Sequence, residues 1–262
     1  MQMITVDVCI DTVFPELKDQ EKIEKVKEIG YQCVEFWFHD NKNVKAIAQG
    51  LKNFQVKLNN LVVNSPDGSR GGSLVKKQDR EIYLERLKHV ISIAKTLNCH
   101  MGITCSGNSV PDLSKNQMMD SIIETLGSAC DILEKESFTL VLEPLNTLVN
   151  HKGYFLDSAK DAAEIIRKIN NPHVKLLYDI YHMQVMEGNL CSFIEKNIDI
   201  IGHFHSAGVP GRHELFEGEI NYPFIIKLLE KLQYRGCFGL EYMPAMKDHT
   251  LSLKKTLEYL MG

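Results

Sequence analysis

Four polar side chains end otherwise apolar runs in the second half of the chain. Glu143 ends the run FTLVLE, and Asp179 ends VKLLYD. His205 and Glu241 end IIGHFH and CFGLE in the same way. Buried carboxylates that lie close together repel one another, and a divalent cation relieves that repulsion. Three carboxylates and one imidazole suit Mn²⁺ or Mg²⁺, and less well Zn²⁺ or Co²⁺. We therefore predict a metal site with these four residues as ligands.

Each of the four residues taken alone has a simpler interpretation, as a salt-bridge partner or as the cap of a following helix. Four of them at equivalent strand ends favour the metal site. A cation beside two glutamates suits proton transfer next to a carbonyl, because it stabilises an enediolate while a glutamate removes the proton and it or the other glutamate returns one. If the proton is returned to the adjacent carbon, the reaction is an aldose–ketose isomerisation. If it is returned to the same carbon from the opposite face, the reaction is an epimerisation.

Two side chains are expected to support the ligands. His203 precedes His205 by two residues, so on a strand it points the same way and lies one layer deeper, as a hydrogen-bonding residue behind the ligands. Asn146, three residues after Glu143, is expected to orient a ligand or to shape the loop. Glu35, in CVEFWF, is interpreted as a further barrel carboxylate or as a buried hydrogen-bonding group.

Two other side chains are predicted to contact the substrate. His182 follows Asp179 by three residues, which places it on a loop just above the metal. Arg212, in VPGRHE, is the predicted fixed positive charge for a substrate carboxylate or hydroxyl. The alternative for Arg212 is a surface side chain paired with Glu214 or Glu219. Other histidines, including His151, have no identifiable partner and are interpreted as solvated.

Short β-branched or aromatic runs that alternate with amphipathic segments must position these residues. The strand candidates are 4–10, 33–38, 57–63, 100–105, 138–144, 174–180, 200–206 and 237–243. Helical periodicity is clear in 21–30, 80–98, 121–135, 158–170, 224–233 and 249–261. Strict alternation predicts a parallel sheet covered by helices, and eight repeats predict closure into a single (β/α)₈ TIM barrel over residues 1–262.

An open doubly wound sheet is the alternative architecture. That fold usually carries a glycine-rich phosphate loop after its first strand. The first strand here continues into DTVFPEL, which contains no glycine. The polar, glycine-rich stretch 64–73 follows the third strand, so it is expected on the active-site face, as a mobile lid or as an ordinary surface loop.

Composition narrows the function classes. The net charge is −4 and no segment is strongly basic, which argues against nucleic-acid binding. Seven cysteines without C-x-x-C spacing are interpreted as free thiols in a reducing cytoplasm. The first residues do not have the pattern of a signal peptide, and no apolar run is long enough for a membrane span.

Six segments of the C-terminal half resemble the hydroxypyruvate isomerase family of the xylose-isomerase-like barrels. They cover about half of the chain, and the most specific is PGRHE followed by GEINYP. The segments are EPLN (143–146), GYFLDS (153–158), DIYHMQVMEGNL (179–190), GHFHSAGVPGRHE (202–214), GEINYPFIIKLLEKLQYRG (218–236) and EYMP (241–244).

The resemblance implies metal ligation at the same four positions, with Glu143 and Glu241 as the acid/base pair. Hydroxypyruvate isomerases generally carry glutamine where this chain has His205, whereas related ketose 3-epimerases carry histidine there. Those epimerases usually continue their first ligand motif as E-P-x-N-R-aromatic-E, and the run EPLNTLVN departs from it. Barrels of this family often pair, which is compatible with a homo-oligomer, although the sequence shows no interface signature.

Four hypotheses follow from these patterns. The first is an isomerase of hydroxypyruvate or a related small oxo-sugar acid, and the second is a ketose epimerase or aldose–ketose isomerase acting on a neutral sugar. The third is an apurinic-site endonuclease, which would need more metal ligands on the early strands than Asp7, Asn59 and Asn60 supply. The fourth is a sugar-binding barrel without catalytic activity, which would not need two glutamates in a complete set of metal ligands.

Overall fold

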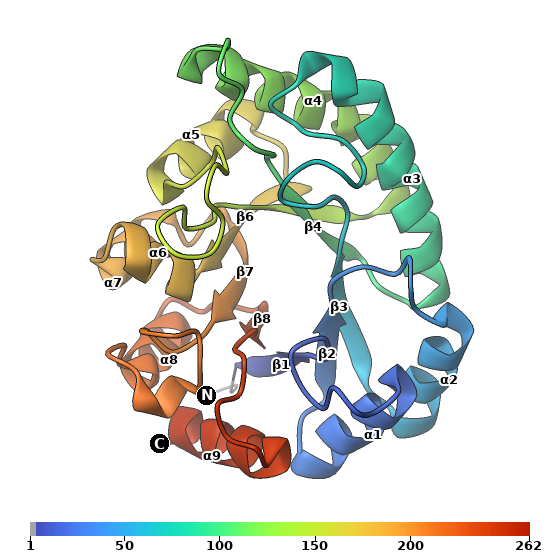
Figure 1. Ribbon diagram of the computed structural model, residues 1–262, viewed down its shortest axis with the longest axis vertical. Helices are drawn as coiled ribbons and strands as arrows, with labels where there is room; N and C mark the ends of the chain where they lie inside the picture. The colour runs from blue at the N-terminus through green and yellow to red at the C-terminus, as the bar shows by residue number, and fades with distance from the viewer. Residues whose placement is uncertain (1–3) are drawn as a thin grey trace.

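Eight parallel strands close into a barrel in which each strand pairs with the next and β8 pairs with β1. The computed structural model describes residues 4–262. Figure 1 shows the strands around the centre, in chain order, with the helices as an outer ring. The strands are β1 (Thr5–Cys9), β2 (Cys33–Phe36), β3 (Lys57–Val62), β4 (Met101–Cys105), β5 (Thr139–Glu143), β6 (Val174–Asp179), β7 (Ile201–Ser206) and β8 (Cys237–Leu240). The predicted TIM barrel is confirmed, with every strand at its expected place.

The helices lie outside the strands. They are α1 (Asp19–Ile29), α2 (Val44–Phe54), α3 (Arg80–Thr96), α4 (Lys115–Glu136), α5 (Ala159–Ile169), α6 (Ile180–Met186), α7 (Leu190–Asn197), α8 (Tyr222–Lys231) and α9 (His249–Met261), with short 3₁₀ helices η1 (Lys77–Asp79) and η2 (Leu215–Glu217). Helices α2, α6 and α7 were not predicted from the sequence. The two helices after β6 are only seven and eight residues long, too short for a clear 3.6-residue period.

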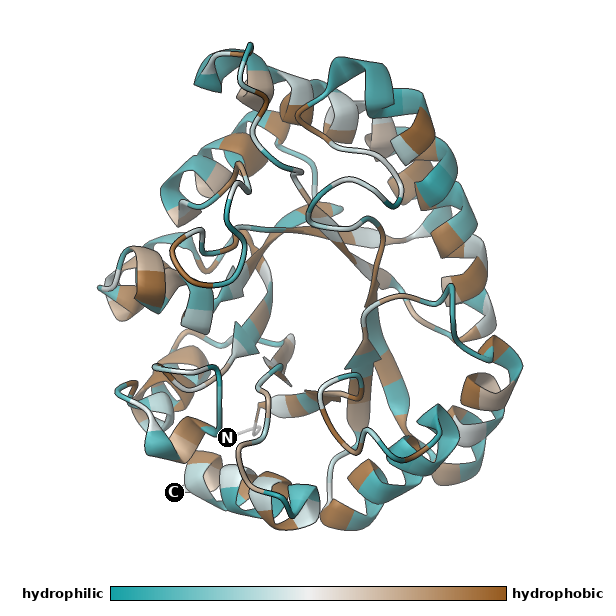
Figure 2. Cartoon of the chain, viewed as in Figure 1, coloured by the Kyte–Doolittle hydropathy of each residue, from teal (hydrophilic) through white to brown (hydrophobic). Residues whose placement is uncertain are grey.

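Local sequence signals explain where the longer helices begin and which face they bury. Ser114 caps α4 in a capping box with Gln117, and Ser158 caps α5 by accepting from the backbone N–H of Asp161. The outer helices carry both hydrophobic and hydrophilic residues (Figure 2). Their apolar side chains pack on the strands and form the main core between sheet and helices.

The barrel interior is divided into an apolar half and a polar half. The apolar half is a separate cluster of buried side chains on β3 to β6: Val62, Ile103, Val141 and Leu177. The polar half lies on β1, β2, β3 and β7, and its buried or half-buried side chains are Asp7, Glu35, Asn59, Asn60, His203 and His205. Leu177 and His203 are paired in register on β6 and β7, so the boundary between the halves runs between them.

The loop that follows β3 is fastened by hydrogen bonds. Asn64 donates to the carbonyls of Gly72 and Cys105, and the Ser65 backbone N–H donates to the carbonyl of Arg70. These contacts tie the stretch 64–73 to itself and to the end of β4. Within residues 4–262, no helix combines the length and apolar character needed to cross a membrane.

Candidate metal centre

The four predicted ligands converge at the C-terminal ends of the strands. One ligand atom from each of Glu143, Asp179, His205 and Glu241 lies within 4.8 Å of every other. All four side chains are buried, with exposed fractions between 1% and 7%. The His205 Nδ1 atom lies 3.3 Å from Glu143 Oε1 and 3.4 Å from Glu241 Oε2. The structure therefore brings together all four residues that the sequence singled out.

Strand ends and one glycine position the ligands. Asp179 ends β6 and also caps α6, because its Oδ1 atom accepts from the backbone N–H of His182 at 3.1 Å. The helix-cap interpretation therefore holds for Asp179 in addition to its place in the cluster. Glu241 lies one residue beyond β8. Gly239 leaves room for the two histidines of β7, since a Cβ atom there would lie 2.8 Å from the His205 ring and 3.0 Å from that of His203.

Buried atoms without partners indicate that the cluster fits a cation. Glu143 Oε1 and His205 Nδ1 have no hydrogen-bond partner among residues 4–262. A buried polar atom left without a partner costs about 1–3 kcal/mol. A donor set of three carboxylates and one imidazole nitrogen is the type that holds a divalent cation in proteins. The four residues therefore fit such an ion, with His205 using its Nδ1 atom.

Two of the carboxylates lie in an environment that disfavours their charge. Burial raises the pKa of Glu143 to about 7, although His205 opposes this shift. Burial likewise raises the pKa of Asp179 to about 6, against the opposing effects of Arg212 and His205. Both residues end strands of the apolar half of the barrel, β5 and β6.

Glu241 lies in the opposite environment, with a donor on each carboxylate oxygen. The Trp37 indole N–H donates to Oε1 at 2.6 Å, and the Arg212 guanidinium contacts Oε2. Burial opposes ionisation of Glu241, but Arg212 and His205 together hold its pKa well below the usual range. This glutamate is therefore fixed and charged. Glu143 Oε1 has the His205 ring 3.3 Å away but no partner with hydrogen-bond geometry among residues 4–262.

A buried polar network supports His205 from behind. Glu35 Oε1 lies 3.0 Å from His205 Nε2, while its Oε2 atom lies 3.0 Å from His203 Nε2 and accepts from Asn60 at 2.6 Å. Burial lowers the pKa of His205, but Glu35 and Glu241 raise it well above the usual value. The imidazolium thus supplies positive charge in the metal-free protein. Glu35 takes part as a carboxylate behind the ring, and His203 lies one layer deeper, as expected.

His182 lies in α6, so its predicted position on a loop is wrong. Its ring is fully buried, and its Nδ1 atom lies 2.7 Å from the Asn146 side-chain amide and 3.2 Å from the Asn146 backbone N–H. Nδ1 is therefore the acceptor, and the hydrogen is on Nε2, which lies 3.5 Å from Asp179 Oδ2. Burial and the nearby Arg212 lower the pKa of His182 well below its usual value, which keeps the ring neutral.

Arg212 points into the site instead of toward solvent. Its backbone has a φ of 61°, in the left-handed region that costs a non-glycine residue about 1–2 kcal/mol. The guanidinium contacts Glu241 and lies 5.5 Å from the centre of the Tyr181 ring. The alternative pairing with Glu214 is not found, since Glu214 accepts from the backbone of Ala245 and Met246 and from Ser252.

Two residues at the site were not recognised from the sequence. Trp37 follows β2 directly, in the middle of the aromatic run FWF, and was not singled out in the sequence. His151 was interpreted as solvated, yet it is only partly exposed and its ring packs edge-on against His182 at 5.3 Å. Neither position carries a local signal, because each reaches the site through contacts with distant segments.

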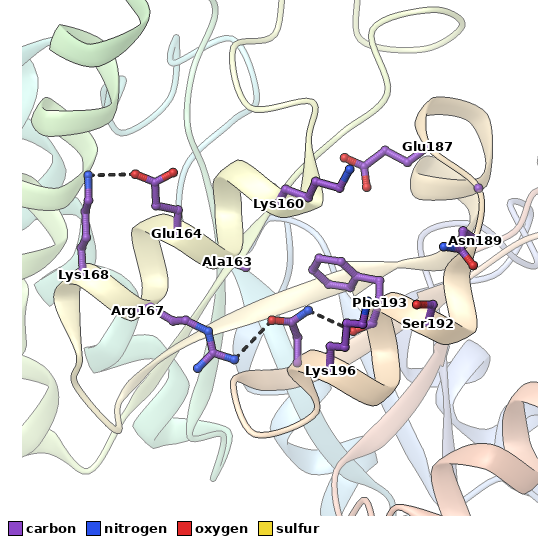
Figure 3. Close-up of a pocket in the computed structure, with 12 residues that line it drawn as sticks. Lys160, Ala163, Glu164, Arg167, Lys168, Glu187, Asn189, Ser192, Phe193 and Lys196 are labelled. Carbon is purple, nitrogen blue, oxygen red and sulfur yellow. Dashed lines mark hydrogen bonds and ion pairs between the residues drawn. The ribbon is translucent and has the colours of Figure 1, made fainter.

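A groove of about 730 Å³ lies away from the strand ends, between α5 and α7 (Figure 3). Two ion pairs lie within or beside it, between Lys168 and Glu164 at 2.9 Å and between Arg167 and Asp199 at 3.0 Å. None of the four predicted metal ligands lines this groove.

The fold and the buried acidic cluster define the class of protein, a TIM barrel with a candidate metal site at its mouth. Sequence comparison identifies the family. The chain belongs to the xylose isomerase-like TIM barrel family, which matches residues 23–260. It is 30% identical to the hydroxypyruvate isomerase of Escherichia coli strain K12, over 92% of this chain and 94% of that protein. It is 28% identical to a 2-oxo-tetronate isomerase of Pectobacterium atrosepticum, over 91% of each. The resemblance to hydroxypyruvate isomerases and the prediction of an isomerase enzyme are confirmed.

Solved structures share the fold over nearly the whole chain. A crystal structure described as AP endonuclease, family 2 from Brucella melitensis is 30% identical, with a TM-score of 0.89 and coverage of 98% of this chain and 99% of that one. D-psicose 3-epimerase from Clostridium cellulolyticum H10 has a TM-score of 0.81 over 98% of each chain. Its identity is only 16%, so it supports the fold alone.

Proposed function

We propose that this chain is a metal-dependent isomerase of a small hydroxy-carbonyl acid, such as hydroxypyruvate or a related oxo-sugar acid. The observation that carries the proposal is the buried cluster of three carboxylates and one imidazole within 4.8 Å of one another. We propose Mn²⁺ or Mg²⁺ as the cation, held by Glu143, Asp179, His205 and Glu241. The relatives named hydroxypyruvate isomerase and 2-oxo-tetronate isomerase support a small oxo-acid as substrate.

The side chains at the site suit proton transfer between neighbouring carbons. A bound cation would supply positive charge that stabilises the negative oxygen of an enediolate. Glu143, with its pKa raised to about 7 and its Oε1 atom held by no hydrogen bond among residues 4–262, suits the base that removes the carbon-bound proton. Glu241 completes the acid/base pair. The Nε2–H group of neutral His182 is available to donate to a substrate oxygen, and Arg212 is the group we propose for the substrate carboxylate.

The test is turnover with Mn²⁺ present on hydroxypyruvate, on 2-oxo-tetronate and on a panel of neutral ketoses. We expect turnover of the oxo-acids, with exchange of the substrate C–H proton in D₂O. Turnover of the ketoses alone would contradict the oxo-acid proposal and favour the epimerase hypothesis. An abasic DNA duplex serves as the control for the endonuclease hypothesis, and its cleavage without isomerisation would overturn the proposal.

Glu143→Gln tests the assignment of the base. The amide keeps the shape of the side chain but cannot accept the proton, so we expect kcat to fall by about 10²–10⁴-fold. Glu214→Gln is the matched control, because Glu214 is another buried glutamate whose carboxylate lies outside the cluster. We expect this control to retain turnover while losing stability. Full turnover by Glu143→Gln would refute the assignment.

A further inference from the structure

Trp37 lies where it can orient one of the ligands. It follows β2, and its indole N–H donates to Glu241 Oε1 at 2.6 Å, across the closure of the barrel between β1 and β8. The two residues are 204 positions apart in sequence. A ring N–H of tryptophan is a donor only, so this contact fixes one oxygen of the carboxylate and leaves no ambiguity about which group donates.

The backbone of Trp37 is itself held in place. Its N–H donates to Asp11 Oδ2 at 2.7 Å, and its carbonyl accepts from the backbone N–H of Val62 at 2.6 Å. Asp11 is in turn paired with Lys42, at 2.5 Å. The donor is therefore positioned before any ligand binds, which is the condition under which an outer hydrogen bond orients a metal ligand.

The indole ring bridges the two halves of the barrel interior. Its apolar surface packs against the cluster that contains Val141 and Leu177. Its N–H reaches Glu241, whose other oxygen is held by Arg212. The Oε2 atom faces His205 Nδ1, so the indole on Oε1 determines which carboxylate oxygen is turned toward the cluster.

We propose that Trp37 is a positioning residue that holds Glu241 in its ligating orientation through the indole N–H. This inference rests on the proposed metal site. The indole does not contact the ion or the reacting atoms in this assignment, and it acts only through Glu241. Trp37 is also the single tryptophan of the chain, so its fluorescence reports on this contact without interference.

The experiment compares Mn²⁺ binding by calorimetry in the unaltered protein and in Trp37→Phe, which keeps an aromatic ring but removes the N–H. We expect the Kd for Mn²⁺ to rise about tenfold or more, as for other residues that orient metal ligands. In a Glu241→Gln background the same substitution should change the Kd by less than about twofold, because the group it acts through is no longer a carboxylate ligand. In the unaltered protein, Mn²⁺ should change the Trp37 emission with the same Kd.

Tyr242→Phe is the matched control. It removes one hydroxyl from a buried aromatic ring next to Glu241 in sequence, and that hydroxyl contacts Ser252 outside the cluster. We expect its Kd for Mn²⁺ to stay within about twofold of the unaltered protein. An unchanged Kd in Trp37→Phe, or an equal loss in the Glu241→Gln background, would overturn this inference alone. Failure of the unaltered protein to bind Mn²⁺ would overturn the proposed function and this inference together.

Discussion

The two halves of the barrel interior shift the pKa of a glutamate carboxyl group in opposite directions. Glu143 ends a strand of the apolar half, where burial raises the pKa of its carboxyl group to about 7. Glu241 faces the polar half, where Arg212 and His205 outweigh burial and lower its pKa. The surroundings, and not the residue type, therefore decide which glutamate is partly protonated near neutral pH and which is held ionised.

The strongest test of this difference is to neutralise each glutamate in turn and to measure the stability of the metal-free protein at pH 8. Glu241→Gln leaves Arg212 buried without its charged partner, so we expect a loss of about 3–5 kcal/mol. Glu143→Gln removes a charge that the fold disfavours, so we expect a gain of about 1 kcal/mol or more.

The sign for Glu143 follows from proton linkage. Its pKa is higher in the folded chain than in the unfolded one, so its ionised form destabilises the fold fully above about pH 7 and not below about pH 4.5. The gain in Glu143→Gln should therefore vanish at acid pH. Chemical denaturation of the metal-free protein at pH 8 and below about pH 4.5 measures the gain in stability and its loss at acid pH. Equal effects of the two substitutions at pH 8 would contradict the division into halves.

A second test substitutes the pair of residues at the boundary. Leu177→Ala leaves a cavity in the apolar half and should cost about 2–5 kcal/mol, while the Mn²⁺ affinity stays nearly unchanged. His203→Leu removes a partner of Glu35 at 3.0 Å, so it should lower both stability and Mn²⁺ affinity. Thermal unfolding and calorimetry measure the two effects. If Leu177→Ala weakened Mn²⁺ binding as much as His203→Leu does, the halves would not be functionally separate.

The smallest expected effect concerns pH and metal affinity. A protonated carboxyl is a poor ligand, and the pKa values of Glu143 and Asp179 are raised to about 7 and about 6. His205 must also lose its Nδ1 hydrogen to bind the ion, and its pKa is raised as well. Mn²⁺ affinity should therefore fall as pH falls, by roughly tenfold per pH unit for each proton that binding releases. Calorimetry in buffers of different ionisation enthalpy counts those protons. Affinity that did not change between pH 8 and pH 5 would contradict the raised pKa values.

Much of the site was predictable because strand ends in a parallel barrel meet at one face. Polar residues that end apolar runs identified Glu143, Asp179, His205 and Glu241, and the two-residue period of a strand placed His203 below His205. The same reasoning misplaced His182, because α6 has only seven residues and its periodicity is too short to recognise.

The amino-acid sequence by itself therefore determined the strands, the barrel and the four residues that meet at its mouth. These features depend on local periodicity and on a fold that has few alternatives. Only the tertiary structure decided the environment of each glutamate. Trp37 reaches Glu241 because β8 closes on β1, and Glu35 reaches His205 across the interior. Which residues meet in this way depends on the register shifts between β2 and β3 and between β6 and β7, and no local pattern encodes those shifts.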